Sequence, residues 1–217
     1  MPIRARTTLL LDLDGTLVDP AEGIIGCYRH ALSILGVPAA EDDDLSWVIG
    51  PSMRESFGQL LAGRGDIDAA VQLYRDHYRE TGLYQARRYP GVRKVLAAHR
   101  ERGARLILCT AKPHIFARRV TDHFELSSLL DAVYGPELDG RHDDKGDLID
   151  HLLREERLDP SEVCMVGDRK HDVLAAARHG IPTVGVLWGY GSREELETAG
   201  AALLVETPAG LLPPPAA

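Results

Sequence analysis

Hydrophobic and polar positions divide the chain into two kinds of segment. Short apolar runs occupy residues 7–11 (TTLLL), 105–109 (RLILC), 131–135 (DAVYG), 162–167 (EVCMVG) and 182–187 (PTVGVL). Runs of this length predict buried strands. The segments between them show helical periodicity, as in residues 91–103, where Val92, Val95, Leu96 and His99 share one face and Gly103 offers a stop. Alternating strands and helices predict an α/β fold with a parallel sheet flanked by helices, which binds ligands beyond the carboxyl ends of its strands.

One region interrupts this alternation. Residues 17–88 contain helical periodicity, as in GIIGCYRHALSILG and AAVQLYRDHYRET, and no apolar run comparable to the strands. The pattern predicts a small helical domain inserted directly after the first strand. We therefore assign residues 1–16 and 89–217 to the α/β core and residues 17–88 to the insert. The final segment LLPPPAA (211–217) is expected to be a frayed tail, because proline cannot donate a backbone hydrogen bond.

Charge and composition narrow the possible partners. The 217 residues carry 25 basic and 33 acidic side chains, a formal net charge of −8, and no expected helix carries a basic stripe. This balance opposes binding to a nucleic-acid backbone. No segment approaches the roughly 20 apolar residues of a membrane-spanning helix, and the first apolar run is too short for a signal peptide. We expect a cytoplasmic protein with no nucleic-acid or membrane partner, and its oligomeric state stays unknown.

Acidic residues follow the first predicted strand. In TTLLLDLDGTLVD, residues 7–19, Asp12 and Asp14 come two positions apart at the carboxyl end of the strand, and Gly15 lets the backbone turn close to a ligand. Two carboxylates about 4 Å apart repel by roughly 4 kcal/mol at an effective dielectric near 20, so such a pair normally has a cation or proton nearby. An Asp-Gly turn whose acids bond only local amides is the alternative. A helix-loop-helix calcium loop does not fit, because Leu17 stands where that loop needs glycine.

A second acidic pair follows another predicted strand, in CMVGDRKHD, residues 164–172. Asp168 comes directly after Gly167, and Asp172 comes just before a helical segment. A position before a helix also suits an ordinary N-cap, so a site role and a capping role for Asp172 stay equally open. Asp168 has no such simple structural explanation.

Two further polar residues stand where strands end or helices begin. Thr110 ends RLILCT, and Pro113 in the following AKPHIF suits the first position of a helix, so the threonine hydroxyl and nearby amides could hold an anion. Lys145 opens a predicted helix, where a cation is unfavourable unless an anion needs it. A polar turn and a solvated lysine are the alternatives. The glycine-bearing GVLWGYGSREE lacks the third glycine of a dinucleotide fingerprint, where Glu194 stands instead.

Taken in order, DLDGT (12–16), Thr110, Lys145 and GDRKHD (167–172) resemble the four motifs of the haloacid dehalogenase superfamily, over nearly the whole chain. The insert resembles the cap of its phosphoglycolate phosphatase and β-phosphoglucomutase branch, and GVLWGYG is similar to a late loop of phosphoglycolate-phosphatase-like members. The resemblance implies a Rossmann-like core with a small helical cap.

The same resemblance assigns roles to individual residues. Asp12 would be the nucleophile and Asp14 the general acid and base. Thr110, with Ala111 beside it, would bind the phosphoryl group, and Lys145 would neutralise its charge. Magnesium would be bound by Asp12, the main-chain carbonyl of Asp14 and Asp168, and Asp172 would support them. Magnesium prefers such oxygen ligands, and phosphoryl transfer depends mainly on positioning and charge neutralisation.

The implied activity is a magnesium-dependent phosphatase acting on a small phosphorylated metabolite through an aspartyl phosphate. Phosphoglycolate is the first substrate to test, and a 5′-nucleotide or sugar phosphate follows. Arg54, in the insert, occupies a position where relatives often place a substrate-recognition residue and could hold a carboxylate, although a surface helix arginine explains it equally well.

Two other activities use similar residues. A β-phosphoglucomutase forms the same intermediate but returns the phosphoryl group to a sugar. A receiver-type phosphoacceptor signalling domain also combines an aspartate, an acidic magnesium pocket, a threonine and a lysine. Its compact sheet has no place for residues 17–88 and gives Asp14 no role.

Overall fold

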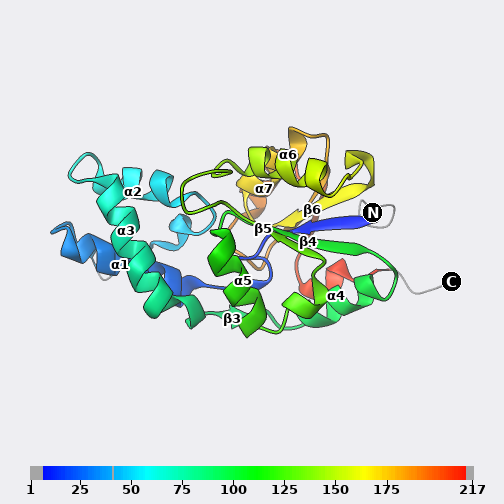
Figure 1. Cartoon of the computed structure of the whole chain (residues 1–217), viewed down its shortest axis with the longest axis horizontal. Coiled ribbons are helices and arrows are strands. Elements are labelled where there is room, and N and C mark those ends of the chain that lie inside the picture. The colour runs from blue at the N-terminus through cyan, green and yellow to red at the C-terminus, as the bar shows by residue number, and fades with distance from the viewer. Residues whose placement is uncertain (1–6, 41, 214–217) are drawn as a thin grey trace. The chain divides into compact units, whose positions relative to one another are not determined.

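The computed structural model describes residues 7–40 and 42–213. The chain divides into two compact units, drawn in Figure 1. The core unit comprises Met1–Asp19 and Arg88–Ala217, and the helical unit comprises Pro20–Arg87. That the first unit is a catalytic core and the second a cap remains a prediction.

The core unit is built on a six-stranded sheet in the order β5-β4-β1-β6-β7-β8, and every neighbouring pair is parallel. Its strands are β1 (Thr8–Leu11), β4 (Arg105–Cys109), β5 (Ala132–Tyr134), β6 (Val163–Gly167), β7 (Thr183–Val186) and β8 (Leu203–Val205). The first five coincide with the apolar runs, so the predicted α/β Rossmann-like architecture is confirmed. The sequence did not predict β8, because three apolar residues are too few to show a period.

Helices cover both faces of this sheet: α4 and α5 lie on one side and α6 and α7 on the other (Figure 1). The helical segments of the core unit are α4 (Val92–Arg100), α5 (His114–His123), α6 (Lys145–Glu155), α7 (Lys170–Ala177) and α8 (Arg193–Ala199), with the 3₁₀ turns η4 (Ser127–Leu129), η5 (Pro160–Glu162) and η6 (Pro208–Leu211). Helices on both faces are what a parallel sheet requires, because its strands are apolar on both sides.

The alternation of side chains along β1 determines which face each residue meets. Leu10 packs with residues of α6 and α7, such as Leu148 and Ala176, in a buried cluster. Leu9 and Leu11 point the other way, toward α4 and η6. Period-two geometry therefore directs Asp12, two residues after Leu10, toward the α6 and α7 side of the sheet.

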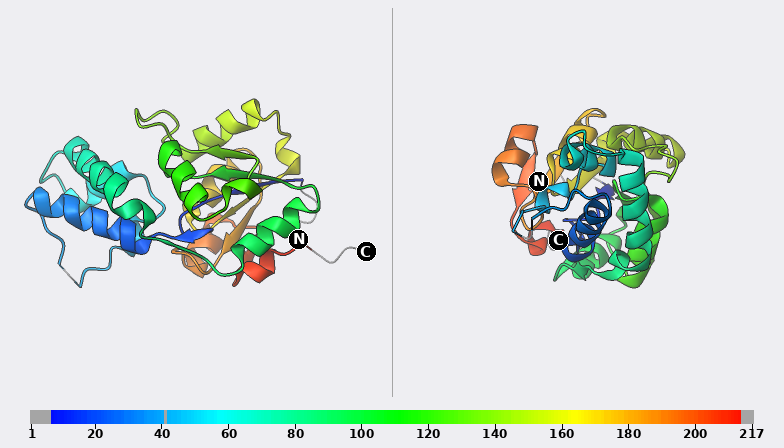
Figure 2. Two further views of the ribbon diagram at one scale, coloured as in Figure 1. Left: turned by 60° about the horizontal axis from the view of Figure 1, so that its bottom comes forward. Right: turned by 90° about the vertical axis from the view of Figure 1, so that its left-hand side faces the viewer.

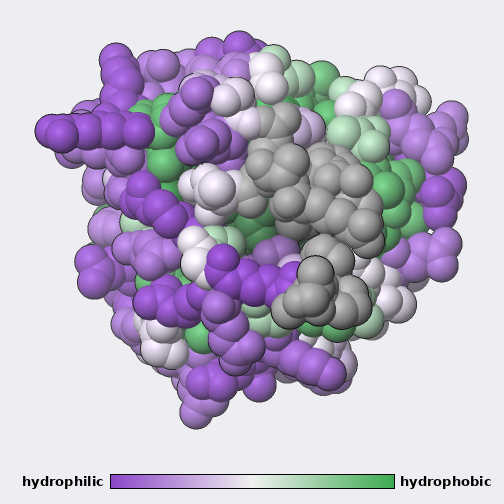
Figure 3. Space-filling view, turned by 90° about the vertical axis from the view of Figure 1, so that its right-hand side faces the viewer, coloured by the Kyte–Doolittle hydropathy of each residue, from purple (hydrophilic) through white to green (hydrophobic). Residues whose placement is uncertain are grey.

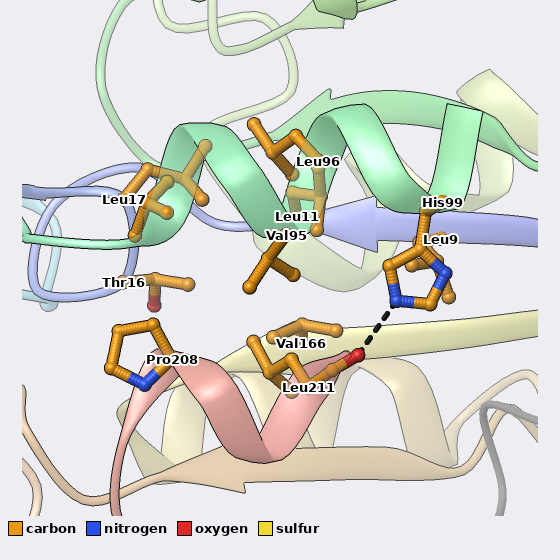
Figure 4. Close-up of a pocket in the computed structure, with 11 residues that line it drawn as sticks. Leu9, Leu11, Thr16, Leu17, Val95, Leu96, His99, Val166, Pro208 and Leu211 are labelled. Carbon is orange, nitrogen blue, oxygen red and sulfur yellow. Dashed lines mark hydrogen bonds between the residues drawn. The ribbon is translucent and has the colours of Figure 1, made fainter. Parts of the chain in front are cut away.

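The α4 side of the sheet is closed by the end of the chain. Figure 2 shows η6 beside α4, and the carbonyl of Leu211 lies 2.7 Å from Nε2 of the buried His99 (Figure 4). The side chains drawn in Figure 4 leave a cavity of about 10 Å³ between them. That volume is at the lower limit for a single water, so this space cannot hold a substrate.

Two predictions are corrected in the core unit. Leu211, expected to start a frayed tail, is buried at the end of η6 and bonded to α4, because its side chain adds to the apolar surface there. Residues 214–217 of that tail lie outside the described residues. The helix after β4 begins at His114, so Pro113 precedes it, with a ψ of 133° that is not helical.

The helical unit contains α1 (Ala21–Ile34), α2 (Met53–Leu61), α3 (Ile67–Glu80) and the 3₁₀ turns η2 (Ser46–Val48) and η3 (Gly82–Tyr84). Its core is aromatic: the rings of Tyr28 and Phe57 are 4.7 Å apart, and those of Tyr28 and Tyr74 are 4.8 Å apart. The expectation that residues 17–88 contain only helices is slightly wrong. The two-residue strands β2 (Val18–Asp19) and β3 (Arg87–Arg88) pair with each other near the ends of this range, and two residues are too short to show a strand period.

The surface agrees with the charged composition. On the face drawn in Figure 3, outside the grey area, hydrophilic residues predominate and hydrophobic ones appear between them. Among residues 7–40 and 42–213, no helix has the length and apolar character to span a bilayer.

Candidate active site

The polar residues selected from the sequence gather at the carboxyl ends of three adjacent strands. Asp12 follows β1, Thr110 follows β4 and Asp168 follows β6. In order along the chain, β4 and β5 extend the sheet on one side of β1, and β6 to β8 extend it on the other. Such a reversal point is where open α/β sheets bind their ligands.

Asp12 and Asp172 share one ammonium group. Asp12 is bonded to β6 through its amide, which donates to the carbonyl of Val166 at 2.9 Å. Lys145, the first residue of α6, places Nζ 2.9 Å from Asp12 Oδ1 and also pairs with Asp172 Oδ1. The two carboxylates are buried, and the side chain of Lys145 is 9% exposed. The cation at the start of α6, unfavourable for the helix alone, is therefore explained by two carboxylates.

Asp172 contacts both the start of helix α7 and the ammonium group of Lys145. Helix α7 begins at Lys170, so Asp172 is its third residue and is not the N-cap that the sequence suggested. Its Oδ2 accepts from the amide of Arg169 at 3.1 Å, as in a capping box, while Oδ1 takes Lys145.

Asp168 is fixed by contacts from two loops. Its Oδ1 accepts from the Thr16 hydroxyl at 3.1 Å, and its Oδ2 accepts from the amide of Tyr190 at 2.8 Å. The indole of Trp188 donates to the carbonyl of Thr16 at 3.1 Å, which ties the two loops together. Asp168 is fully buried, so both of its oxygens are held in place.

Glycines make this close approach possible. A Cβ on Gly15 would lie 2.1 Å from Asp168 Oδ2, and the φ of Gly15 is +83°. Added Cβ atoms on Gly189 and Gly191 would lie 2.4 Å and 2.0 Å from atoms of Asp168. The GVLWGYG segment therefore packs its backbone against this aspartate, which accounts for glycines that do not fit a dinucleotide motif.

Burial and charge crowding dominate the electrostatics of the site. Loss of water raises the pKa of Asp168 well above its ordinary value, and the neighbouring Asp172 and Asp12 raise it further. Burial also raises the pKa of Asp172 to about 6, against the lowering effect of Lys145. Burial disfavours the charge on Lys145, but Asp12 and Asp172 together raise its pKa above the ordinary value. The crowded carboxylates therefore favour a further cation or a proton at this point.

Asp14 lies beside a second buried lysine. Lys112 Nζ is 2.9 Å from Asp14 Oδ2, and the two side chains are 4% and 13% exposed. Burial raises the pKa of Asp14, while Lys112 lowers it. The other oxygen, Oδ1, is buried and has no hydrogen-bond partner among the described residues.

Thr110 and Ala111 form the turn between β4 and α5. The amide of Thr110 donates to the carbonyl of Tyr134 at 3.1 Å, and its hydroxyl accepts from the amide of Lys112 at 3.2 Å. Thr110 is buried and Ala111 is half-buried. One hydrogen bond to β5 and one within the turn therefore fix its conformation. Phosphoryl binding by these two residues stays a prediction.

Arg54 lies in the helical unit. It is the second residue of α2, its side chain is 56% exposed, and its guanidinium pairs with Asp68 of α3. Substrate binding by Arg54 stays a prediction.

Three contacting residues were not selected as site residues from the sequence: Thr16, Lys112 and Tyr190. Thr16 belongs to the DLDGT motif, and Lys112 lies in the turn between Ala111 and Pro113. Tyr190 acts through its backbone amide, which has no sequence signal.

The carboxylates fit a magnesium ion. Asp12, Asp168 and Asp172 each offer an oxygen, and these oxygens lie within 4.8 Å of one another. Three buried carboxylates form a hard, anionic oxygen donor set of the kind that Mg²⁺ prefers. The side chain of Asp14 is not part of this cluster, and metal binding by the main-chain carbonyl of Asp14 stays a prediction.

The chain is similar to known hydrolases and phosphatases over most of its length. A model of the haloacid dehalogenase-like hydrolase family matches residues 9–186. A 5′-nucleotidase from Pseudomonas aeruginosa is 42% identical over 190 residues, which cover 87% of this chain and 86% of that protein. A phosphoglycolate phosphatase from Caulobacter vibrioides is 31% identical over 212 residues, which cover 92% and 86% of the two chains.

Two further proteins are similar over much of the chain. A protein from Mycobacterium tuberculosis named tyrosine-protein kinase PtkA is 38% identical over 189 residues, which cover 87% of this chain but 65% of that protein. The crystal structure of a predicted phosphatase from Clostridium acetobutylicum superposes with a TM-score of 0.90 at 32% identity and covers 95% of this chain and 96% of that one.

Proposed function

The chain belongs to the haloacid dehalogenase-like hydrolase family and is a phosphatase, and we propose that it hydrolyses small phosphomonoesters with magnesium through a phosphorylated Asp12. The observation that carries the proposal is the buried arrangement of Asp12 between Lys145 and the carboxylates of Asp168 and Asp172. Family membership also decides against a receiver-type signalling domain.

Asp12, Asp168 and Asp172 offer the side-chain oxygens for the metal, together with the carbonyl of Asp14. When bound, Mg²⁺ neutralises charge on the transferring phosphoryl group. The support for this site is that the three carboxylates are buried and place oxygens within 4.8 Å of one another.

In the first half of the reaction, a carboxylate oxygen of Asp12 attacks phosphorus while the bond from phosphorus to the ester oxygen breaks. Lys145 is 2.9 Å from Asp12 and can neutralise charge there and on the phosphoryl oxygens. Thr110 and the amide of Ala111 are assigned to hold a phosphoryl oxygen.

Asp14 acts as the general acid in the first half of the reaction and as the general base in the second. It gives a proton to the leaving oxygen as the ester bond breaks and thereby becomes a carboxylate. In the second half it takes a proton from the water that attacks phosphorus, the bond between Asp12 and phosphorus breaks, and inorganic phosphate leaves. Burial raises the pKa of Asp14, which favours the protonated acid that the first half needs.

A 5′-nucleotide is the substrate to test first, because the relative named 5′-nucleotidase is 42% identical over most of both chains. Phosphoglycolate is the second candidate, since a relative with that name is 31% identical over 92% of this chain. This order reverses the expectation from the sequence.

A release assay for inorganic phosphate tests the proposal. A panel of 5′-nucleotides, 2-phosphoglycolate, sugar phosphates and 4-nitrophenyl phosphate is incubated with and without Mg²⁺ and without any sugar bisphosphate. We expect magnesium-dependent phosphate release that excess chelator abolishes. No release from any ester, or release only when a sugar bisphosphate is supplied, would reject a hydrolase in favour of inactivity or a mutase.

A further inference from the structure

Lys112 is a buried cation that the reaction as described does not use. Its ammonium lies 2.9 Å from Asp14 Oδ2, while Lys145 neutralises Asp12 and Asp172. A buried ion pair is a costly way to add stability, because both charges lose water, so its presence beside a reacting group asks for another explanation.

The backbone of Lys112 is held firmly. Its amide donates to the Thr110 hydroxyl at 3.2 Å, and a Cβ on Gly135, just after β5, would lie 2.3 Å from the Lys112 carbonyl oxygen. Pro113 follows with a φ of −48°. The side chain therefore starts from a fixed point at the ends of β4 and β5 and reaches Asp14 beyond β1.

The two oxygens of Asp14 are treated differently. Oδ2 forms an ion pair with Lys112, whereas Oδ1 is buried without a hydrogen-bond partner among the described residues. A buried oxygen left in this state is unfavourable, and such exceptions call for a functional explanation. An ammonium group can only donate, so Oδ2 must act as an acceptor toward Lys112. The oxygen that remains for exchanging a proton with substrate or water is Oδ1.

We propose that Lys112 is a positioning residue, which holds Asp14 by Oδ2 and so presents Oδ1 to the leaving oxygen and later to water. The proposal rests on the function proposed above and extends it by one residue. Lys112 acts through Asp14 and does not need to touch the substrate.

A double-mutant cycle tests this proposal. The Lys112→Met, Asp14→Asn and doubly substituted proteins are compared with wild type on two substrates, with Lys94→Met, an exposed lysine of α4, as the control. One substrate is the alkyl phosphomonoester that wild type hydrolyses fastest in the panel, and its leaving group needs a proton. The other is 4-nitrophenyl phosphate, whose leaving group needs little help. Single-turnover rates of ester cleavage are measured.

A well-placed general acid contributes about 10²–10⁴-fold, so losing its orientation should slow the alkyl ester by at least about tenfold in Lys112→Met and the aryl ester by less than about threefold. In the Asp14→Asn background, Lys112→Met should change the rate by less than about twofold. Lys112→Arg, which keeps a donor-only cation, should recover most of the activity toward the alkyl ester, and Lys94→Met should match wild type.

Two results would overturn the proposal: equal losses on both esters, or a Lys112→Met effect that persists at full size without the Asp14 carboxylate. The second would mean that Lys112 contacts the substrate itself. If Lys112→Met does not fold, judged by its thermal transition, Lys112→Gln takes its place in the same cycle. Failure of the proposed function is distinguishable, because wild type would then cleave neither ester.

Discussion

Gly15 is the residue where backbone conformation and site geometry depend on each other most directly. Its φ of +83° suits glycine, and its missing side chain leaves room for Asp168 Oδ2, which a Cβ would approach to 2.1 Å. Gly103 is a suitable control position for Gly15, because its φ is +77° but an added Cβ would have no atom within 4 Å.

We therefore expect Gly103→Ala to lower the free energy of unfolding by about 1–2 kcal/mol, the cost of a left-handed conformation, and to leave turnover unchanged. Gly15→Ala should carry the same conformational cost and also displace Asp168, so turnover should fall by more than about tenfold. Chemical denaturation and steady-state kinetics check both variants. Equal turnover in the two would show that the contact with Asp168 is unimportant.

Asp168 gives a second prediction at this scale. Asp168→Ala should weaken Mg²⁺ binding by at least about tenfold, since it removes one of three clustered carboxylates. Isothermal titration with Mg²⁺ alone measures this without any substrate. Asp150→Asn, which alters an exposed pair on α6, is the control and should bind as wild type does. Unchanged affinity in Asp168→Ala would place the metal elsewhere.

The sequence could single out Asp12, Asp168 and Lys145 as candidates because each stands at the end of a strand or the start of a helix, and the structure brings the three together. It could not identify the partner of Asp14. Lys112 is in a turn, where the direction of a side chain depends on the close contact with Gly135 that only the folded chain provides. The role of the Tyr190 amide was hidden for a similar reason.

At the scale of elements, α4 shows which features of a helix its hydrophobic periodicity can predict. The spacing placed His99 on the apolar face of this helix, and the structure confirms it. What periodicity could not supply is the partner: the carbonyl of Leu211, at the end of a four-residue 3₁₀ turn more than 100 residues later, lies 2.7 Å from Nε2. Strand β8 and the turn η6 are too short to predict, yet they complete this side of the core.

Burial of His99 is expected to make stability depend on pH. Burial lowers the pKa of His99 from its ordinary 6.5, the Leu211 carbonyl opposes that effect, and Arg102 adds to it. The folded chain therefore favours neutral His99, and the unfolded chain binds the proton more readily. The contribution is complete above about pH 6.5 and is lost as the pH falls below it.

We expect His99→Gln to be less stable than wild type at pH 8, and the difference to shrink as the pH falls from 7 toward 5. Urea denaturation at several pH values measures this, with His123→Gln, an exposed histidine at the end of α5, as the control. A constant difference across the range would mean that His99 does not titrate differently in the two states.

At the scale of the whole molecule, one activity is expected to draw on two units. The core unit is proposed to carry out the phosphoryl transfer, and the helical unit is expected to supply selectivity. Periodicity identified the insert because its helices are long. Periodicity could not give the exact boundary of the insert: the helical unit is Pro20–Arg87, whereas the expected range was 17–88.

Arg54 tests this division. If its guanidinium binds an anionic group of the substrate, Arg54→Ala should raise KM by about 10- to 100-fold, as expected for a lost charged hydrogen bond, and leave kcat nearly unchanged. Arg79→Ala is the matched control, since Arg79 is also exposed in the helical unit and paired with an aspartate. Steady-state kinetics on the preferred substrate decide. Equal KM values in both variants would leave Arg54 with a surface role.

The central claim is that Asp12 becomes phosphorylated while Asp14 moves protons. Intact-protein mass spectrometry after mixing with 4-nitrophenyl phosphate tests it most directly, because this leaving group departs without much acid assistance. Asp14→Asn keeps the nucleophile but lacks the base that activates water, so it should accumulate one phosphoryl group, and peptide mapping should place that group on Asp12. Asp12→Asn should carry none. A phosphoryl adduct in Asp12→Asn, or normal turnover in either variant, would contradict the account.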